Sequence, residues 1–177
     1  MVESVALLRG INVGRAKRVP MAELRDLLES LGCSGVKTLL NTGNAVFQAP
    51  KGSSRELAAT IEKAIQGRFG FPVPVLVHTA REFNAIIADN PMPRAAQDPS
   101  RFLVAFVSSK AQLARAKPLL KESWSPEKFA IGGKAAYLWC ASGIRESRLL
   151  QAFGKVTESS ITTRNWATVL KIQAVLS

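Results

Sequence analysis

The segment at residues 9–14, Arg-Gly-Ile-Asn-Val-Gly, has residue types that could bind an anion. Glycines that follow a strand let the backbone approach a ligand closely and expose amide N–H groups. Arg9, together with the downstream Lys17 and Arg18, could neutralise a phosphate. The alternative is that the glycines only shape a loop between a strand and a helix. The sequence leaves both interpretations open.

Two further segments combine hydroxyl, amide and guanidinium groups. Residues 42–44, Thr-Gly-Asn, could offer a hydroxyl and an amide to the same site, or they form an ordinary hairpin turn. Residues 162–166, Thr-Thr-Arg-Asn-Trp, suit an anion at a helix N-terminus, with an indole that could stack a base. The alternative there is a helix cap followed by a core tryptophan. The candidate ligand-binding residues are Arg9, Gly10, Asn12, Gly14, Thr42, Asn44, Thr163, Arg164, Asn165 and Trp166.

Other kinds of site find little support in the sequence. Gly10 and Gly14 have the wrong spacing for a dinucleotide fingerprint, and no Gly-Lys-Ser/Thr of a P-loop follows them. His78 is the one histidine, so neither a metal cluster nor a Ser-His-Asp set is recognisable. Cys33 and Cys140 form no Cys-x-x-Cys motif, which favours free thiols in a reducing compartment. We therefore expect no metal site and no cofactor, and the sequence names no catalytic residue.

Hydrophobic patterns predict a βαββαβ unit over residues 1–79. Apolar residues at helical spacing predict one helix that begins near Pro20 and a second that begins after Ser53, which has capping-box spacing with Glu56. Four short apolar or alternating segments predict strands, at residues 5–11, 36–40, 45–47 and 73–77. That order is the ferredoxin-like one, in which two helices cover one face of an antiparallel sheet.

The rest of the chain predicts a linker and a second unit of the same order. Residues 80–100 should hold a short helix, capped by Thr79 and Glu82, and a proline-rich linker. In residues 101–177 we expect Ser109 with Gln112 to cap a helix that runs to about residue 116, and Asn165 to cap a C-terminal helix. The other expected elements are strands at 102–107, 128–131, 134–140 and 160–163, and a helix around 147–153. The sequence thus predicts an α+β protein of two ferredoxin-like βαββαβ halves with antiparallel sheets, plus a C-terminal helix.

The net charge of +11 is the unusual total of this composition. Lysine and arginine are spread along the chain, with a local cluster at residues 15–18, Arg-Ala-Lys-Arg. Such an excess favours polyanions, acidic partners or phosphate-bearing ligands. No apolar run approaches the roughly 20 residues that a membrane span needs, so we expect a cytoplasmic protein without a membrane partner. The sequence says nothing about the oligomeric state.

Several motifs together resemble the family known as domain of unknown function 1697. The resemblance rests on residues 6–14, on Val-Pro-Met at 19–21 with Leu24, on Thr-Gly-Asn at 42–44, on residues 68–75 and on residues 162–171. Thr42 stands where the family usually has serine, and Arg15 follows Gly14 where a second glycine is common. The resemblance implies two ferredoxin-like halves, and it implies no known activity.

Three hypotheses about function follow from these observations. The first is a protein that binds an anionic ligand, with nucleic acid as the first choice, because of the charge and the sheet-based fold. The second is an enzyme acting on a small phosphorylated or nucleotide-like molecule, with the three candidate segments meeting in one cleft between the halves. The third is a protein interaction module without ligand chemistry.

Overall fold

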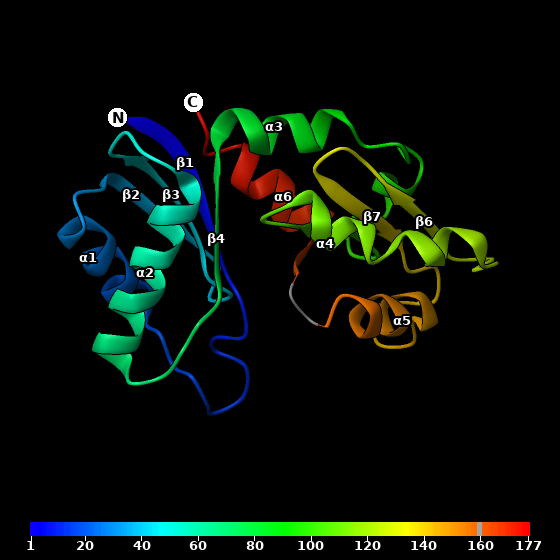
Figure 1. Ribbon diagram of the computed structural model, residues 1–177, viewed down its shortest axis with the longest axis horizontal. Helices are drawn as coiled ribbons and strands as arrows, with labels where there is room; N and C mark the ends of the chain where they lie inside the picture. The colour runs from blue at the N-terminus through cyan, green and yellow to red at the C-terminus, as the bar shows by residue number, and fades with distance from the viewer. Residues whose placement is uncertain (159–160) are drawn as a thin grey trace. The chain divides into compact units, whose positions relative to one another are not determined.

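The computed structural model describes residues 1–158 and 161–177 of the chain. The chain divides into two compact units. The first unit comprises Met1–Phe83 and Ile172–Ser177, and the second comprises Asn84–Lys171. Each unit contains one four-stranded antiparallel sheet with helices, so the predicted α+β class is confirmed (Figure 1).

The first unit has the element order of a ferredoxin-like fold. Its sheet has the strand order β2-β3-β1-β4, in which β1 is central and pairs with both β3 and β4. The elements are β1 (Val2–Leu8), α1 (Met21–Ser30), β2 (Ser34–Leu39), β3 (Asn44–Ala49), α2 (Ser54–Phe69) and β4 (Val75–Thr79). The predicted βαββαβ order is therefore confirmed in this unit.

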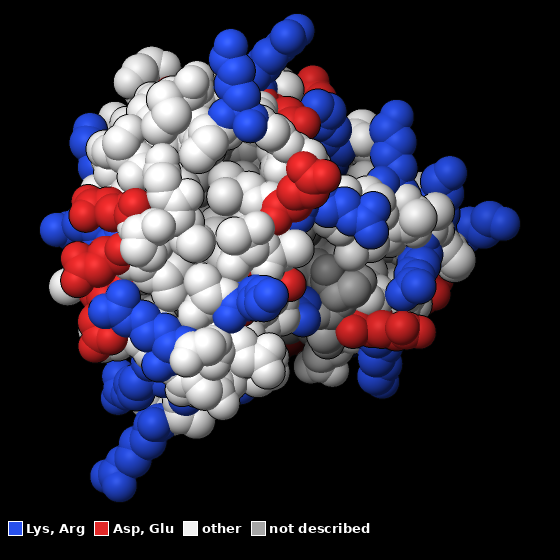
Figure 2. Space-filling view, turned by 60° about the vertical axis from the view of Figure 1, so that its left-hand side comes forward, with Lys and Arg blue, Asp and Glu red and all other residues white. Residues whose placement is uncertain are grey.

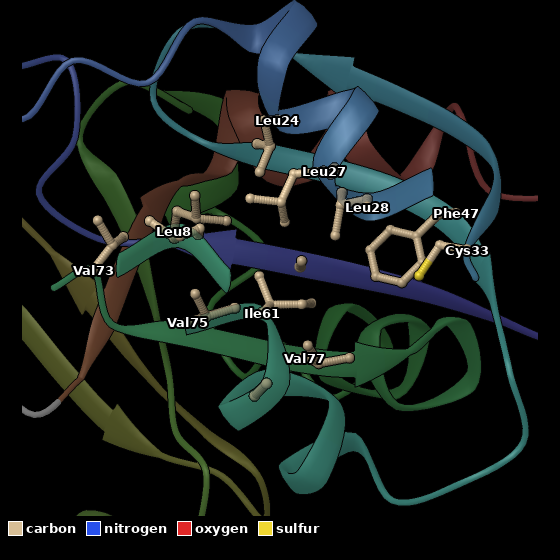
Figure 3. Close-up of a cluster of buried hydrophobic side chains, with 14 of the residues drawn as sticks. Leu8, Leu24, Leu27, Leu28, Cys33, Phe47, Ile61, Val73, Val75 and Val77 are labelled. Carbon is tan, nitrogen blue, oxygen red and sulfur yellow. The ribbon is translucent and has the colours of Figure 1, made fainter. Parts of the chain in front are cut away.

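Helices α1 and α2 cover one face of this sheet. Alternate strand residues such as Leu8, Phe47 and Val77 point to that face and pack against helix residues such as Leu28 and Ile61 (Figure 3). Side chains alternate along a strand and recur every three or four residues along a helix, so each element presents one apolar face to this core. Burial of each such side chain stabilises the unit by about 1.5–3 kcal/mol.

The helix ends of the first unit follow the sequence signals with small differences. Pro20, which the sequence predicts in the first turn of a helix, instead precedes α1 as its N-cap residue, and the helix begins at Met21. Ser53 caps α2, but its hydroxyl accepts from the N–H of Arg55 and not from that of Glu56. Gly70 ends α2 in the left-handed conformation, with φ +82°.

The capping box predicted at residues 79–82 is confirmed. The Thr79 hydroxyl accepts from the Glu82 N–H at 3.2 Å, and the Glu82 carboxylate accepts from the Thr79 N–H at 3.0 Å. Two donors at the start of helix α3 (Ala80–Ala88) are satisfied reciprocally in this way. The boundary of the two units falls inside α3, after Phe83.

The second unit repeats the strand order of the first. Its sheet has the order β6-β7-β5-β8, so the central strand β5 again pairs with the third and fourth strands of the unit. The elements are η1 (Ala95–Gln97), β5 (Phe102–Phe106), α4 (Lys110–Ala114), η2 (Lys117–Lys121), β6 (Lys128–Ile131), β7 (Ala135–Trp139), α5 (Arg148–Val156), β8 (Thr162–Asn165) and α6 (Trp166–Gln173). The last two residues of α6 belong to the first unit. The predicted second ferredoxin-like half and the C-terminal helix are confirmed.

The second unit departs from the prediction in its first crossover and last strand. The helix expected to run to residue 116 ends at Ala114, and the 3₁₀ helix η2, with Pro118 in its first turn, follows it. Ser109 makes no side-chain cap, and the Gln112 side chain accepts from the backbone N–H of Ser108. The strand predicted at residues 160–163 lies partly outside the described residues, and the observed strand β8 covers Thr162–Asn165.

A half-buried carboxylate, Glu127, holds the start of α5 through a hydrogen-bond network. The Ser147 hydroxyl accepts from the Leu150 N–H and donates to one oxygen of the Glu127 carboxylate. The other oxygen of Glu127 accepts from the Leu149 N–H at 3.1 Å. The first turn of α5 therefore has two of its backbone donors satisfied by side chains, which stabilises a helix N-terminus.

Candidate functional site

The first two candidate segments lie at the same end of the first sheet. Strand β1 ends at Leu8, and Leu7 pairs with Asn44, the first residue of β3. The loop that follows β1 and the turn that joins β2 to β3 therefore leave the sheet side by side (Figure 1). The Leu8 N–H donates to the carbonyl of Gly43 at 2.8 Å, which fixes the turn to the end of β1. We call residues 10–18 and 40–43 the loop pair.

Asn12 joins the two members of the loop pair. Its side-chain Oδ1 accepts from the Val19 N–H at 2.9 Å, and its Nδ2 donates to the Val19 carbonyl at 2.9 Å. The same Nδ2 donates to the carbonyl of Asn41 at 2.7 Å. The Asn12 N–H also donates to the Lys17 carbonyl at 3.1 Å. One amide side chain therefore closes the loop at residues 12–19 and ties it to the turn.

The backbone of the first loop turns repeatedly into the left-handed region. Gly10, Asn12, Gly14 and Lys17 have φ of +73°, +54°, +64° and +50°. Glycine and asparagine adopt this conformation at lower cost than other residues. Left-handed residues that alternate with right-handed ones turn successive backbone N–H groups to one side, which forms a concave binding surface for an anion. In this loop the left-handed residues Gly10, Asn12 and Gly14 occupy every second position, a spacing that such anion-binding loops share.

Gly43 lets the turn lie directly against the strand end. It has φ +88°, and a Cβ atom there would lie 2.7 Å from the Leu8 Cβ and 2.9 Å from the Ile11 Cδ1. Those separations are far below van der Waals contact, so no other residue fits without a shift of the backbone. Close approach, rather than the turn alone, requires glycine at this position.

The two polar candidates that flank Gly43 differ in exposure. Thr42 is exposed, whereas Asn44 is completely buried. The Asn44 Nδ2 donates to the Leu39 carbonyl at 2.9 Å and to the Thr42 hydroxyl at 3.0 Å. Asn44 therefore stabilises the turn from its buried side through these two hydrogen bonds, and Thr42 is the residue of this segment that faces solvent.

Three cations of the loop pair are exposed. Arg15, Lys17 and Arg18 are all solvent-exposed, and within the described residues none of them lies within ion-pairing distance of a carboxylate. Arg9 is half-buried, and its backbone N–H donates to the Pro74 carbonyl at 3.0 Å. The loop pair therefore presents unpaired positive charge beside the left-handed backbone.

Basic residues elsewhere are scattered. Figure 2 shows lysine and arginine side chains distributed over the face in view, interrupted by uncharged surface and by groups of acidic side chains. Residues 1–83 and 172–177 hold 11 Lys and Arg against 7 Asp and Glu, and residues 84–171 hold 13 against 6. The net charge of +11 is thus shared as +4 and +7, and both units are basic.

The third candidate segment belongs to the second unit. Thr163 and Arg164 lie on β8, where they pair with Ala105 and Val104 of β5. The Arg164 guanidinium donates to the Thr163 carbonyl at 2.9 Å. Burial lowers the pKa of this guanidinium to about 10, because a charged group is less stable away from water. Arg164 is half-buried.

The last two residues of the third segment have structural partners. The Asn165 Oδ1 accepts from the Thr168 N–H at 2.9 Å, which confirms Asn165 as the cap of α6. Trp166 is 6% exposed, and its ring centroid lies 5.2 Å from that of Phe102. This placement favours the alternative of a core tryptophan over an indole that stacks a base.

The loop pair also contains two features that the sequence did not reveal. Val13 and Leu40 are 73% and 45% exposed, although both are large apolar residues. Leu40 has φ +58°, which is rare for a bulky residue. Their types alone predict burial, so no sequence signal could have placed them on the surface.

A small cavity of about 170 Å³ lies at the other end of the same sheet. It is lined by the start of α2, including Ser53 and Ser54, and by residues at the ends of the strands. Lys51 and Glu56 both line it, so their opposite charges offset each other. It is therefore less suited to an anion than the loop pair.

Two kinds of site are not found in the part of the chain that the structure describes. No group of three or more His, Cys, Asp and Glu side chains in residues 1–158 and 161–177 could hold a metal ion. No helix among these residues is long and apolar enough to cross a lipid bilayer.

Comparison with known proteins relates this chain to proteins without an assigned activity. A family model described as "Protein of unknown function (DUF1697)" matches residues 1–137. The resemblance at residues 162–171 lies outside the matched range and stays a prediction. A solved structure of a conserved bacterial protein from Streptococcus pneumoniae is similar, with a TM-score of 0.78 and 24% identity, over 98% of this chain and 97% of that chain. No curated protein matches the chain.

Proposed function

Since this chain belongs to the family described as protein of unknown function (DUF1697), we propose a function from its own residues: it binds a phosphate-bearing anion at the loop pair, with nucleic acid as the first choice. The observation that carries the proposal is the set of three hydrogen bonds that the Asn12 side chain makes to Val19 and Asn41, which we call the Asn12 clamp. It holds a loop with three exposed cations, which pair with no carboxylate of residues 1–158 and 161–177, beside a left-handed backbone.

A preformed loop supports anion binding because it lowers the entropic cost of binding. A flexible loop must be ordered when a ligand arrives, whereas this one is already closed by its side-chain hydrogen bonds. Arg15, Lys17 and Arg18 have no carboxylate partner to give up among the described residues, so a phosphate gains their full attraction. Backbone amides contribute further donors of fixed direction.

The charge distribution supports a polyanion over a single small phosphate. A small metabolite needs positive charge at its site, and the rest of the surface can be neutral. Both units of this protein carry an excess of Lys and Arg, as +4 and +7. Such an excess attracts a long polyanion from a distance and raises the rate of encounter.

The enzyme hypothesis stays a prediction. It requires the third segment, residues 162–166, to join the loop pair around one substrate. Within the second unit, Asn165 and Trp166 are engaged as a cap and as part of the core. No observation on the described residues favours it over binding.

A salt series with single-stranded oligonucleotides tests the proposal. Fluorescence anisotropy of a labelled oligonucleotide gives the association constant, and its logarithm falls linearly with the logarithm of salt concentration. The triple variant Arg15→Gln, Lys17→Gln and Arg18→Gln should bind more weakly. If each side chain neutralises one phosphate, the slope for a single strand becomes shallower by about 2.

A matched variant separates a site from general charge. Arg25→Gln, Lys63→Gln and Arg81→Gln remove the same charge from exposed positions on helices of the first unit. This control should change the slope by well under half as much. Equal effects of the two triple variants, or no binding at low salt by the unaltered protein, would contradict the proposal.

A further inference from the structure

The loop pair exposes apolar surface next to its cations. Val13 is 73% exposed and Leu40 is 45% exposed, and each is the sequence neighbour of a residue in the Asn12–Asn41 hydrogen bond. That 2.7 Å bond holds the backbone of the first loop against that of the turn, so that residues 13 and 40 belong to the same region of the chain's surface. Lys17 is fixed to the same region, because its carbonyl accepts from the Asn12 N–H.

The left-handed backbone conformation of Leu40 is energetically unfavourable for a leucine. A left-handed conformation is unfavourable for a non-glycine residue, and a bulky side chain there is a genuine outlier. Glycine or asparagine would hold the same turn at lower cost. Strained residues of this kind concentrate at functional sites. The exposed leucine side chain itself is therefore a feature to be explained.

A phosphate group gives no reason for these two side chains. Phosphate is bound by cations and N–H donors, and apolar side chains only lower the local polarity around it. A nucleobase has a flat face that is poorly hydrated and that gains free energy when it covers apolar surface. A nucleotide of a single strand carries both chemistries within one residue, whereas a duplex keeps its base faces stacked inside.

From this mixture we infer that the loop pair binds single-stranded nucleic acid through its bases as well as its phosphates, with a base packed on Val13 and Leu40. The inference rests on the proposed function, because the cations of the loop pair hold the neighbouring phosphates. It adds that the ligand must be single-stranded and must carry bases. Apolar contact with every base is possible, so the binding is not expected to depend on sequence.

The test compares three probes of matched negative charge on the full-length protein. They are a labelled single-stranded oligonucleotide, a chain of the same length made of abasic sites, and inorganic polyphosphate. The variant Val13→Ser with Leu40→Asn removes the apolar surface, and asparagine tolerates the left-handed conformation, so the fold is retained. Leu120→Asn removes an exposed leucine of the second unit as a control.

The inference predicts that the unaltered protein prefers the oligonucleotide to the abasic chain by roughly 2- to 5-fold, which is below the range for bases stacked on aromatic rings because Val13 and Leu40 are aliphatic. The Val13 and Leu40 variant should lose this preference and keep its affinity for the abasic chain and polyphosphate, and the Leu120 variant should keep both. Equal affinity of the unaltered protein for all three probes would overturn the inference and leave the proposed function standing.

Two other outcomes are also decisive. No binding to any of the three probes would overturn the proposed function, and the inference with it. Binding to vesicles of anionic phospholipid that depends on Val13 and Leu40, together with no base preference, would replace the inferred ligand by a lipid surface.

Discussion

Replacement of Asn12 should destabilise the protein, because one amide makes three side-chain hydrogen bonds. Asn12→Ala removes the two bonds to Val19 and the bond to the Asn41 carbonyl. Each is worth about 0.5–1.5 kcal/mol, with the exposed bond to Asn41 at the lower end. Alanine is also less favourable than asparagine at φ +54°. The free energy of unfolding should fall by about 2–4 kcal/mol, which corresponds to a melting temperature lower by roughly 4–15 °C.

Two further variants separate the causes of that loss. Asn12→Gly removes the side chain but tolerates the left-handed backbone, so it isolates the hydrogen bonds. Asn41→Ala is the control, because Asn41 contributes its backbone carbonyl to the clamp, and alanine keeps that group. Thermal unfolding followed by circular dichroism measures all three. A melting temperature of Asn12→Ala within one or two degrees of that of Asn41→Ala would refute the clamp.

Three other measurements test separate parts of the structure. Gly43→Ala should lower the free energy of unfolding by about 3 kcal/mol or more, because the added Cβ would overlap Leu8. Gly10→Ala has open space around its Cβ at a similar φ and should cost about 1–2 kcal/mol. Equal losses in urea unfolding would show that Gly43 does not lie in close contact with Leu8. Tyr137 is the single tyrosine of the sequence, and burial, reinforced by the charge of Asp89, raises its pKa to about 12. Its neutral form is favoured on folding, so its contribution to stability is present below pH 10 and is lost as the pH rises toward 12; phenolate absorbance that appeared near pH 10 in the folded protein would contradict this. Glu127→Gln should cost about 1–3 kcal/mol in urea unfolding. The two oxygens of Glu127 accept separately from the Ser147 hydroxyl and the Leu149 N–H, and the amide nitrogen that replaces one of them can only donate. An unchanged unfolding free energy would exclude the carboxylate network.

The fold was largely predictable because its signals are local and repeated. Short apolar runs and the alternating valines at residues 73–77 predicted strands, and helical spacing of leucines predicted α1. The caps at Thr79 with Glu82 and at Asn165 were recognised from residue types at fixed offsets. Repetition of the same order in both halves made the ferredoxin-like prediction consistent.

The side-chain cap and the C-terminal end predicted for α4 were wrong. The cap was wrong because neighbouring residues of similar chemistry can serve the same position at a helix start. Ser108 and Ser109 can both serve a helix start, and the sequence does not show that Gln112 bonds to the first of them. The break between α4 and η2 depends on Pro118, whose effect on the preceding turn was missed.

The candidate site was predicted in outline but without its organisation. Residue types pointed to Asn12 and to residues 42–44, but a long-range bond from Asn12 to the Asn41 carbonyl has no sequence pattern. The sequence also gave no reason to expect Val13 and Leu40 at the surface, because exposure depends on how the loop closes. Long-range contacts of loops are the part of a structure that local propensity determines least.

The central claim is that the loop pair is the place where a phosphate-bearing ligand binds. Nuclear magnetic resonance tests it most directly, by following every backbone amide of the full-length protein during titration with a short single-stranded oligonucleotide. The claim predicts that the largest chemical-shift changes fall on residues 10–18 and 40–43, and that the Arg15, Lys17 and Arg18 variant loses them. Changes that centre instead on the second unit, or that spread evenly over all basic residues, would contradict it.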